Sequence, residues 1–271
     1  MSVFAGQGDP EWSIAALWDQ EEAAPRGPAP GPRPALSRDA IVEAAIEIAD
    51  QAGLAGLSMK AVGQRLGRTA MALYTYVPGK DELLDLMHDR VHGELPTSYP
   101  LGRGWRAAAR AWARDLGKFF LRHPWTLQIS YARPVLGPNE QAMLETLVGI
   151  LRETGLTAPA VRRAVSALLH LVRGAAQTRV DARSAASATG TASTPWWHAR
   201  ASQLHRVVPD FAQRFPHSTW LARQGTTGAR GDPETYFVRQ ADQAYAAAVE
   251  LLFDGIEAQL ERRTKRKISG S

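Results

Sequence analysis

One stretch decides how the N-terminal part of this 271-residue chain folds: Leu73-Tyr74-Thr75-Tyr76-Val77-Pro78-Gly79-Lys80-Asp81-Glu82-Leu83-Leu84. Pro78-Gly79 ends one helix, because proline disfavours a helical residue before it, and Asp81 begins the next helix. The helix before the break is short: it covers residues 70–76, with Thr69 as its N-cap. The stretch therefore predicts a short helix, a sharp turn and a longer second helix.

Two more helices are predicted before this stretch. The first opens with Ser37 as N-cap, buries apolar residues at helical spacing and ends at Gly53. The second starts from Ser58 as N-cap and stops at Gly67. Only a short turn separates this second helix from the helix over 70–76. The pair therefore fits the helix-turn-helix pattern, and the first helix completes a small core.

The segment from Leu36 to Met87 resembles the DNA-binding domain of the TetR family of bacterial one-component repressors. The matching residues are Ser37-Arg38-Asp39-Ala40-Ile41-Val42-Glu43-Ala44-Ala45, Gly56-Leu57-Ser58-Met59, Val62-Gly63-Gln64-Arg65-Leu66-Gly67 and the stretch quoted above. These motifs fall in order at the family's spacing. The resemblance implies double-stranded operator DNA as a partner and a DNA-binding domain over 36–95, whose last helix is a linker.

The first turn of the short helix is expected to read bases in the major groove, through Thr69, Ala70, Met71 and Ala72. Most of these side chains are small and apolar, so they suit thymine methyl groups better than guanine edges. Lys60 matches a base-contacting position in some members of the family and is the candidate for a guanine contact.

Phosphate contacts are expected from the residues around the reading turn. They are Arg38, Ser58, Arg68, Tyr74, Tyr76 and Lys80. Three of these have a second interpretation: Ser58 is also a helix cap, Arg68 is also explained as a solvated turn residue, and one tyrosine is also explained as partly core.

Charge is distributed unevenly along the chain. The net charge is +5, but residues 1–35 carry −3 and residues 36–95 also carry −3, so the remaining 176 residues carry +11. Between Asp50 and Asp81, however, there is no acidic residue and there are four basic ones. This acid-free window can approach phosphates even though its flanks are acidic.

Composition excludes several classes of protein. Without cysteine there are no disulfides, thiol nucleophiles or thiolate zinc sites. No secretory signal and no apolar run of membrane-spanning length is found, so we expect a cytoplasmic protein with no membrane partner. The sequence also lacks the nucleophile elbow, phosphate loop, dinucleotide fingerprint and zinc-protease motif, which argues against an enzyme.

The chain outside the DNA-binding domain divides into three parts. Residues 1–35 are expected to be a flexible arm with a Pro/Gly linker over 25–34, and 263–271 a solvated basic tail. The arm is either a passive tail or a minor-groove contact through Arg26, Arg33 and Arg38. Residues 96–262 are expected to form a larger helical bundle, so that the whole chain is all-α, with a mobile loop over 184–194.

The stretch from Gly104 to about Arg179 is similar to the ligand-binding domain of the tetracycline-repressor branch. The residues that carry this are Arg133-Pro134, Glu140 to Leu147, Gly155-Leu156 with Ala160, and Ala167-Leu168-Leu169-His170 with Gly174. The similarity implies a homodimer with a four-helix interface and one pocket in each subunit. The residues that would supply the seam are Ala244, Ala247, Ala248, Leu251, Leu252 and Ile256; the alternative is that they pack within one subunit.

Polar and large aromatic side chains on the bundle helices are candidates for ligand contact, because buried polar groups need partners. They are His92, Trp125, Tyr131, His170, Arg173, Gln177 and Trp196. His88 and His92 have the spacing of a helical metal pair, but no third ligand is visible, so neither a metal nor a cofactor is expected. These histidines are otherwise explained as part of the pocket floor or of a hinge.

Two functions fit these features. The first is a ligand-responsive homodimeric repressor, which a small aromatic or polycyclic effector releases from its operator. The second is a DNA-binding regulator without a small ligand, in which the C-terminal half serves dimerisation only.

Overall fold

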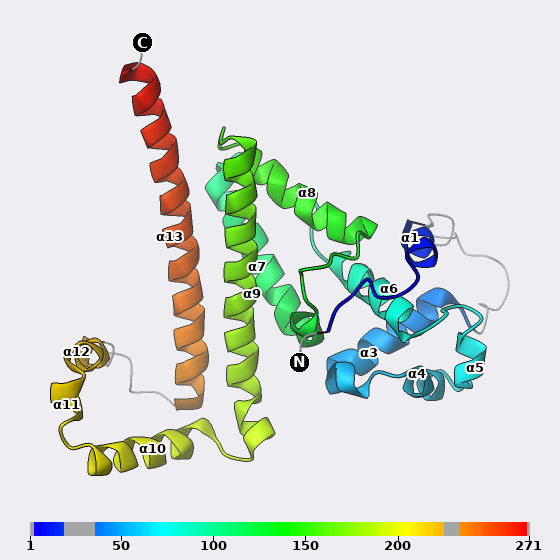
Figure 1. Cartoon of the computed structure of the whole chain (residues 1–271), viewed down its shortest axis with the longest axis horizontal. Coiled ribbons are helices and arrows are strands. Elements are labelled where there is room, and N and C mark those ends of the chain that lie inside the picture. Colours follow the sequence, from blue (N-terminus) through cyan, green and yellow to red (C-terminus); the bar gives the residue numbers. More distant parts are fainter. Residues whose placement is uncertain (1–2, 19–35, 225–232, 270–271) are drawn as a thin grey trace. The chain divides into compact units, whose positions relative to one another are not determined.

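The computed structural model describes residues 3–18, 36–224 and 233–269, and for 224, 233–238 and 263–269 it describes the backbone alone. The chain forms two compact units: Met1–Arg173 with Leu252–Ser271, and Gly174–Leu251. All described elements are helices, and the predicted all-α class is confirmed (Figure 1). Among the described helices, none is both long and apolar enough to span a bilayer.

The predicted helix-turn-helix is formed by α3, α4 and α5, which span Arg38–Gly56, Met59–Arg65 and Ala70–Leu73. All three predicted N-caps are confirmed: the hydroxyls of Ser37, Ser58 and Thr69 accept hydrogen bonds from backbone N–H groups three residues later. The end of the first helix at Gly53 is also confirmed. This glycine has φ 66°, which breaks the helical run inside α3.

The turn between α4 and α5 is tight. Gly67 adopts φ 65°, and a Cβ on Gly63 would lie 2.8 Å from the carbonyl oxygen of Arg68. Glycine at 63 therefore lets the two helices approach closely. Beneath the turn, Leu73 and Val77 are fully buried.

α6 (Lys80–His92) follows the Pro-Gly break and leads into the bundle of the first unit. It is unusual in burying four titratable side chains, Asp85, His88, Asp89 and His92, on a helix whose other buried residues are apolar. Besides α1, which is described below, the remaining elements of this unit are α7 (Trp105–Arg122), the 3-10 helix η1 (Pro124–Gln128), α8 (Pro138–Arg152), the first half of α9 (Ala158–Thr189) and the last part of α13 (Pro233–Ser269).

The second unit consists of the end of α9, the first part of α13 and three helices between them, α10 (Ser193–Val207), α11 (Phe211–Arg214) and α12 (Pro216–Gln224). Within this unit α9 and α13 are tied by an ion pair between Arg179 and Asp242 at 2.5 Å. Many large apolar side chains of α10–α12 are exposed, among them Trp197, Val207 and Trp220.

Three expectations differ from the structure. Residues 3–18 do not behave as a flexible arm: α1 spans Pro10–Trp18, and Val3 forms an isolated parallel bridge with Ile129. The rest of that predicted arm, 19–35, including Arg26 and Arg33, lies outside the described residues.

The other two corrections concern helix ends. The predicted loop over 184–194 is helical as far as Thr189, because its alanines favour the helix and its Ser and Thr hydroxyls bond to carbonyls of the preceding turn. Low complexity was therefore the wrong signal there. α13 also continues through much of the predicted tail, to Ser269.

Candidate functional site

The reading surface is formed by α4, α5 and the start of α6. Lys60, Arg68, Thr69, Met71, Tyr74, Tyr76 and Lys80 are exposed on it. Met71 is 76% exposed, which is far more than a core methionine tolerates, so this side chain is free to meet a partner. Ala70 and Ala72 are half-buried on α5, where their small size leaves the backbone approachable.

The electrostatics of this surface favour an anionic partner. Between Gln51 and Lys80 no residue is acidic. Upstream of this window, the carboxylate of Glu47 forms an ion pair with Arg65. Among the described residues, neither Lys60 nor Arg68 forms an ion pair with a carboxylate. Two exposed positive charges on an acid-free surface suit a phosphate backbone.

Ser58 and Arg38 differ from the other predicted DNA contacts. The Ser58 hydroxyl already accepts the N–H of Ala61 at 3.1 Å, so it is a helix cap first. Arg38 is half-buried at the start of α3, and its guanidinium carbon lies 5.6 Å from the centre of the Trp12 ring. The structure therefore places Arg38 against α1 rather than on the α4–α5 surface.

A second candidate site is a buried polar cluster in the first unit, formed by His88, His92, Tyr131 and Arg173. The rings of His88 and His92 are 4.5 Å apart, and those of His88 and Tyr131 are 6.4 Å apart. The guanidinium carbon of Arg173 lies 4.5 Å from the centre of the Tyr131 ring. The cluster thus contains three of the predicted ligand residues, His92, Tyr131 and Arg173, together with His88. They come from α6, α9 and the segment after η1.

Several polar atoms of this cluster have no hydrogen bond of normal geometry. They are both ring nitrogens of His88, Nε2 of His92 and the hydroxyl of Tyr131. Since His92 donates its Nδ1–H to the carbonyl of His88 at 2.6 Å, its Nε2 presents a lone pair. Unsatisfied groups of this kind are costly in a protein interior, and a bound molecule can satisfy them.

These groups are neutral near pH 7. Burial, followed by the neighbouring His92 and Arg173, lowers the pKa of His88 well below its usual value. Burial likewise lowers the pKa of His92 to about 4 and raises the pKa of Tyr131 to about 12. The two histidines and Tyr131 therefore offer neutral donors and acceptors beside the charged Arg173, and the rings of Phe119 and Phe120 lie next to them.

Arg173 and Trp125 are mainly structural. The guanidinium of Arg173 donates to the carbonyls of Leu127 and Ile129 at 2.5 and 2.6 Å, which fixes the end of η1. Trp125 is 1% exposed and donates its Nε1–H to Asp50 at 2.8 Å, so its polar edge is already satisfied. The indole N–H of Trp125 and the Nη2 atom of Arg173 are therefore already engaged by the protein.

The other predicted ligand residues do not join the cluster. His170 is exposed and bonds to the carbonyl of Ser166 in its own helix. Gln177 is exposed, bonds to Asp181 and belongs to the second unit, as does Trp196. Sequence reasoning missed Phe119 and Phe120 as lining residues, and it gave His88 as half of a possible metal pair or as part of the pocket floor or of a hinge. In the described part of the chain, no three His, Cys, Asp or Glu side chains are grouped to hold a metal ion.

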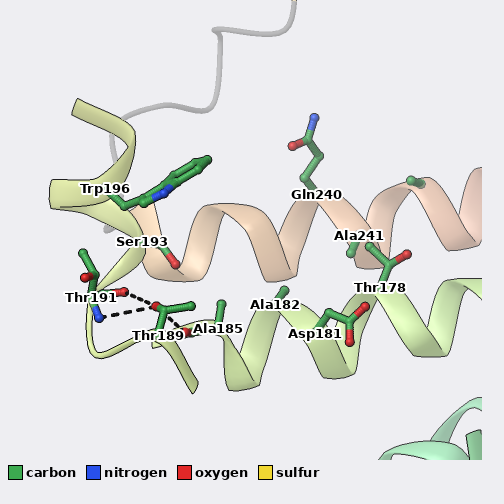
Figure 2. A pocket seen from close by; sticks show the side chains of 11 residues that line it. Thr178, Asp181, Ala182, Ala185, Thr189, Thr191, Ser193, Trp196, Gln240 and Ala241 are labelled. Carbon is green, nitrogen blue, oxygen red and sulfur yellow. Dashed lines mark hydrogen bonds between the residues drawn. The ribbon is translucent and has the colours of Figure 1, made fainter. Parts of the chain in front are cut away.

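Trp196 lies in a cavity of the second unit. The cavity has a volume of about 710 Å³ and is lined by residues of α9, α10, α13 and the turn before α10. Figure 2 shows Trp196 from α10 at one end, and Thr178, Asp181, Gln240 and Ala241 on the facing helices α9 and α13. Its hydroxyl groups at Thr189 and Thr178 already bond to backbone carbonyls, so it holds fewer unmet polar groups than the cluster of the first unit.

Two family profiles match most of the chain. The family profile described as bacterial regulatory proteins, tetR family, matches residues 41–87, and the profile described as tetracyclin repressor-like, C-terminal domain, matches residues 100–260. The chain is 42% identical over 213 residues to the HTH-type transcriptional repressor DrrR1 of Streptomyces coeruleorubidus, covering 78% of this chain and 77% of the relative.

Two further relatives extend the comparison. An HTH-type transcriptional regulator of Saccharopolyspora erythraea is 33% identical over 206 residues, or 76% of this chain and 84% of the relative. The crystal structure of the TetR family protein ActR of Streptomyces coelicolor in complex with actinorhodin is 30% identical, with a TM-score of 0.64, and covers 83% of this chain and 98% of that chain. The chain therefore belongs to the TetR family: it is a helix-turn-helix transcriptional repressor with a tetracyclin repressor-like C-terminal domain, and not an enzyme.

Proposed function

We propose that this repressor works as a homodimer and leaves its operator when a small aromatic or polycyclic molecule enters the buried cluster of His88, His92, Tyr131 and Arg173. The observation that carries the proposal is the set of unsatisfied polar atoms on His88, His92 and Tyr131 in the interior of the first unit. A molecule with hydroxyl or carbonyl groups on a flat apolar frame would satisfy these atoms and pack against Phe119 and Phe120.

The chemistry of the cluster favours a neutral polar edge on the ligand. The lone pair on His92 Nε2 accepts a hydroxyl, and the phenol of Tyr131 donates to a carbonyl. Actinorhodin is bound by ActR, a relative that is 30% identical over most of its length. It is therefore a reasonable first probe for this chain, without being assumed to be the natural effector.

Operator binding is proposed to use the exposed side chains of the reading surface. Lys60, Arg68 and Lys80 supply charge, while Tyr74 and Tyr76, 45% and 37% exposed, supply hydroxyls for phosphate oxygens. Thr69, Ala70, Met71 and Ala72 are proposed to face base edges. Two such surfaces, one from each subunit, would meet successive major grooves about 34–36 Å apart.

Dimerisation is proposed through exposed small and apolar residues on α13 and α9. On α13, Ala244, Ala247 and Leu251 are exposed at helical spacing, and Leu251 is 72% exposed. On α9, Ala167, His170 and Gly174 are also exposed at helical spacing. One part of the predicted seam needs correction, because Ile256 is only 4% exposed and packs within its own unit.

The decisive experiment is an operator-release titration. Operator sequences are first selected from a random duplex library with the purified protein, and actinorhodin is then titrated into the complex. Release at micromolar probe supports the proposal. Selected DNA that is bound but never released, together with no change in melting temperature across a panel of polycyclic compounds, would favour a regulator without a small ligand.

Two tyrosine variants locate the site. Tyr131→Phe removes only the unpartnered hydroxyl, so we expect probe affinity to fall at least fivefold while operator affinity is kept. Tyr99→Phe is the matched control: its hydroxyl bonds to Asp115, outside the cluster, and probe affinity should not change. Equal losses in both variants would contradict the placement of the site.

A further inference from the structure

Residues 3–18 are fastened along the first unit by three sets of contacts. The first set joins the start of the chain to the segment after η1. The N–H of Val3 donates to the carbonyl of Gln128 at 2.9 Å, and the N–H of Ser130 donates to the carbonyl of Val3 at 2.8 Å. This parallel bridge holds residues 128–130 from one side.

The second set joins the same segment to α6. The carboxylate of Asp85 accepts the backbone N–H of Gly6 at 2.7 Å and the hydroxyl of Ser13 at 3.2 Å. The carboxylate of Glu82 accepts the N–H of Asp9 at 3.0 Å. Asp85 and Ser13 are 1% and 5% exposed, so this is a buried attachment rather than a surface contact.

The third set lies at the end of α1. The indole Nε1–H of Trp18 donates to the carbonyl of Leu136 at 3.0 Å, and the guanidinium of Arg133 lies 5.9 Å from the centre of the Phe4 ring. Close packing also constrains the sequence: a Cβ on Gly8 would lie 2.7 Å from Glu82 Oε1. Figure 1 shows this N-terminal trace running beside α6 to reach α1.

The two elements bound by residues 3–18 are the same elements that frame the buried cluster. α6 carries His88 and His92 on the turns that follow Asp85, and the segment 128–136 carries Tyr131. The His88 and Tyr131 rings meet edge to face between these elements, with their centres 6.4 Å apart. A molecule that inserts between the two rings has to move α6 and the 128–136 segment apart.

We propose that residues 3–18 are a regulatory strap, which holds α6 against the 128–136 segment and stabilises the ligand-free, operator-binding conformation of the repressor. The strap contacts are lost when α6 and the 128–136 segment move apart. The strap therefore raises the effector concentration that is needed to release the operator. This inference rests on the proposed function for the identity of the site, but the strap itself is testable without any ligand.

The physical basis is linkage between two conformations. Contacts that exist in only one conformation raise the population of that conformation, and a ligand that prefers the other must overcome them. Because only residues 74–79 separate the end of α5 from the start of α6 at Lys80, we expect a change in the position of α6 to move the DNA-reading surface as well. Weakening the strap should therefore lower operator affinity even when no effector is present.

A cysteine pair tests this in a single protein. The chain has no native cysteine, and the side chains of Ser13 and Asp85 are in contact, so the double variant Ser13→Cys with Asp85→Cys gives a strap that is untied when reduced and tied when oxidised. In the reduced form we expect amides of 128–136 to exchange with deuterium at least tenfold faster than in wild type, and operator affinity to fall at least threefold. Oxidation should restore both.

Two single variants keep the test valid if the cysteine pair does not fold or oxidise. Ser13→Ala removes one strap hydrogen bond, whereas Glu11→Ala changes an exposed residue of the same helix. We expect faster exchange in 128–136 and weaker operator binding for Ser13→Ala alone. Identical behaviour of these two variants, or faster exchange with unchanged operator affinity, would overturn the proposal.

The outcome separates the strap from the proposed function. If wild type binds its operator but actinorhodin and the other polycyclic compounds never release it, the effector part of the proposed function is lost. The strap is judged only on deuterium exchange and operator affinity in the absence of ligand, so that result leaves its test intact.

Discussion

The carboxylate of Asp89, in the middle of α6, accepts the backbone N–H of Glu140 at 2.9 Å and so caps the N-terminus of α8. The same oxygen accepts the N–H of Asn139 at 3.0 Å. Two of the free N–H groups at the start of α8 are therefore satisfied by a residue from another helix, which locks α6 to α8. Gly137 is part of this arrangement, because a Cβ there would collide with Asp89.

Replacing Asp89 should destabilise the first unit. Asp89→Ala leaves buried N–H groups without an acceptor, and we expect the free energy of unfolding to fall by about 2–3 kcal/mol. Asp89→Asn keeps one acceptor oxygen but loses the charge, so we expect the free energy of unfolding to fall by about 1 kcal/mol. Urea denaturation followed by circular dichroism measures both.

Asp181→Ala provides the comparison for this measurement. Asp181 is exposed on α9, and its carboxylate accepts a hydrogen bond from Gln177 in the same helix. A change of less than about 0.5 kcal/mol is expected for an exposed pair of this kind. If Asp181→Ala and Asp89→Ala lower the free energy of unfolding by the same amount, the Asp89 cap on α8 does not contribute to stability as described.

The buried histidines should lower stability as the pH falls from about 6.5 towards 4, whereas Asp85, Asp89 and Glu140, whose pKa values burial raises, act in the opposite direction. Unfolded His92 takes up a proton near its ordinary pKa of 6.5, whereas in the folded chain burial lowers this pKa to about 4. The unfolded state therefore binds more protons across this range. By pH 4, His92 alone lowers the free energy of unfolding by about 3 kcal/mol. His88 acts in the same direction.

His123 opposes this trend. Burial lowers its pKa, but hydrogen bonds with Asp50 and Glu94 outweigh burial and raise it above the ordinary value. Its contribution is therefore present at low pH and is lost as the pH rises through the folded pKa. Comparing His92→Gln with wild type isolates His92. The variant should lose less stability between pH 6.5 and 4, whereas His170→Gln, which alters an exposed histidine, should follow wild type.

Local signals in the sequence predicted the reading domain well. The N-caps at Ser37, Ser58 and Thr69 and the break at Gly53 depend on hydrogen bonds and backbone angles within a few residues, so a short stretch of sequence contains the information. The candidate DNA contacts follow from the same local pattern, with Arg38 as the exception because α1 packs against it.

The buried cluster and the strap depend on contacts between distant parts of the chain. Arg173 reaches the carbonyl of Leu127, and the N–H of Gly6 reaches Asp85, 79 residues away. No periodicity in residues 3–18 reports these partners, since most of them are backbone groups. Composition also misled at 184–189, where serine and alanine indicated a loop but tertiary packing and helix propensity extend α9.

Operator binding should depend on Lys60. Because this side chain is exposed on α4 within the acid-free window, we expect Lys60→Ala to weaken operator binding about tenfold and to reduce its salt dependence by about one ion. Lys118→Ala removes the same charge from the exposed face of α7 and should leave affinity within twofold. Fluorescence anisotropy at several salt concentrations measures both, and full retention by Lys60→Ala would refute the reading surface assigned to α4 and α5.

The proposed dimer seam predicts that a charge at Leu251 separates the subunits. A side chain that is 72% exposed in the single chain has room for glutamate without loss of folding, so Leu251→Glu should keep its helical circular dichroism. Sedimentation should nevertheless shift from dimer to monomer, because two carboxylates would face each other across a two-fold interface. Operator affinity should fall at least tenfold, since each half-site is then bound alone.

Leu101→Glu is the control for this prediction. Leu101 is 42% exposed in the loop before α7, and the variant should remain dimeric. A Leu251→Glu protein that also remains dimeric would show that α13 does not form the seam.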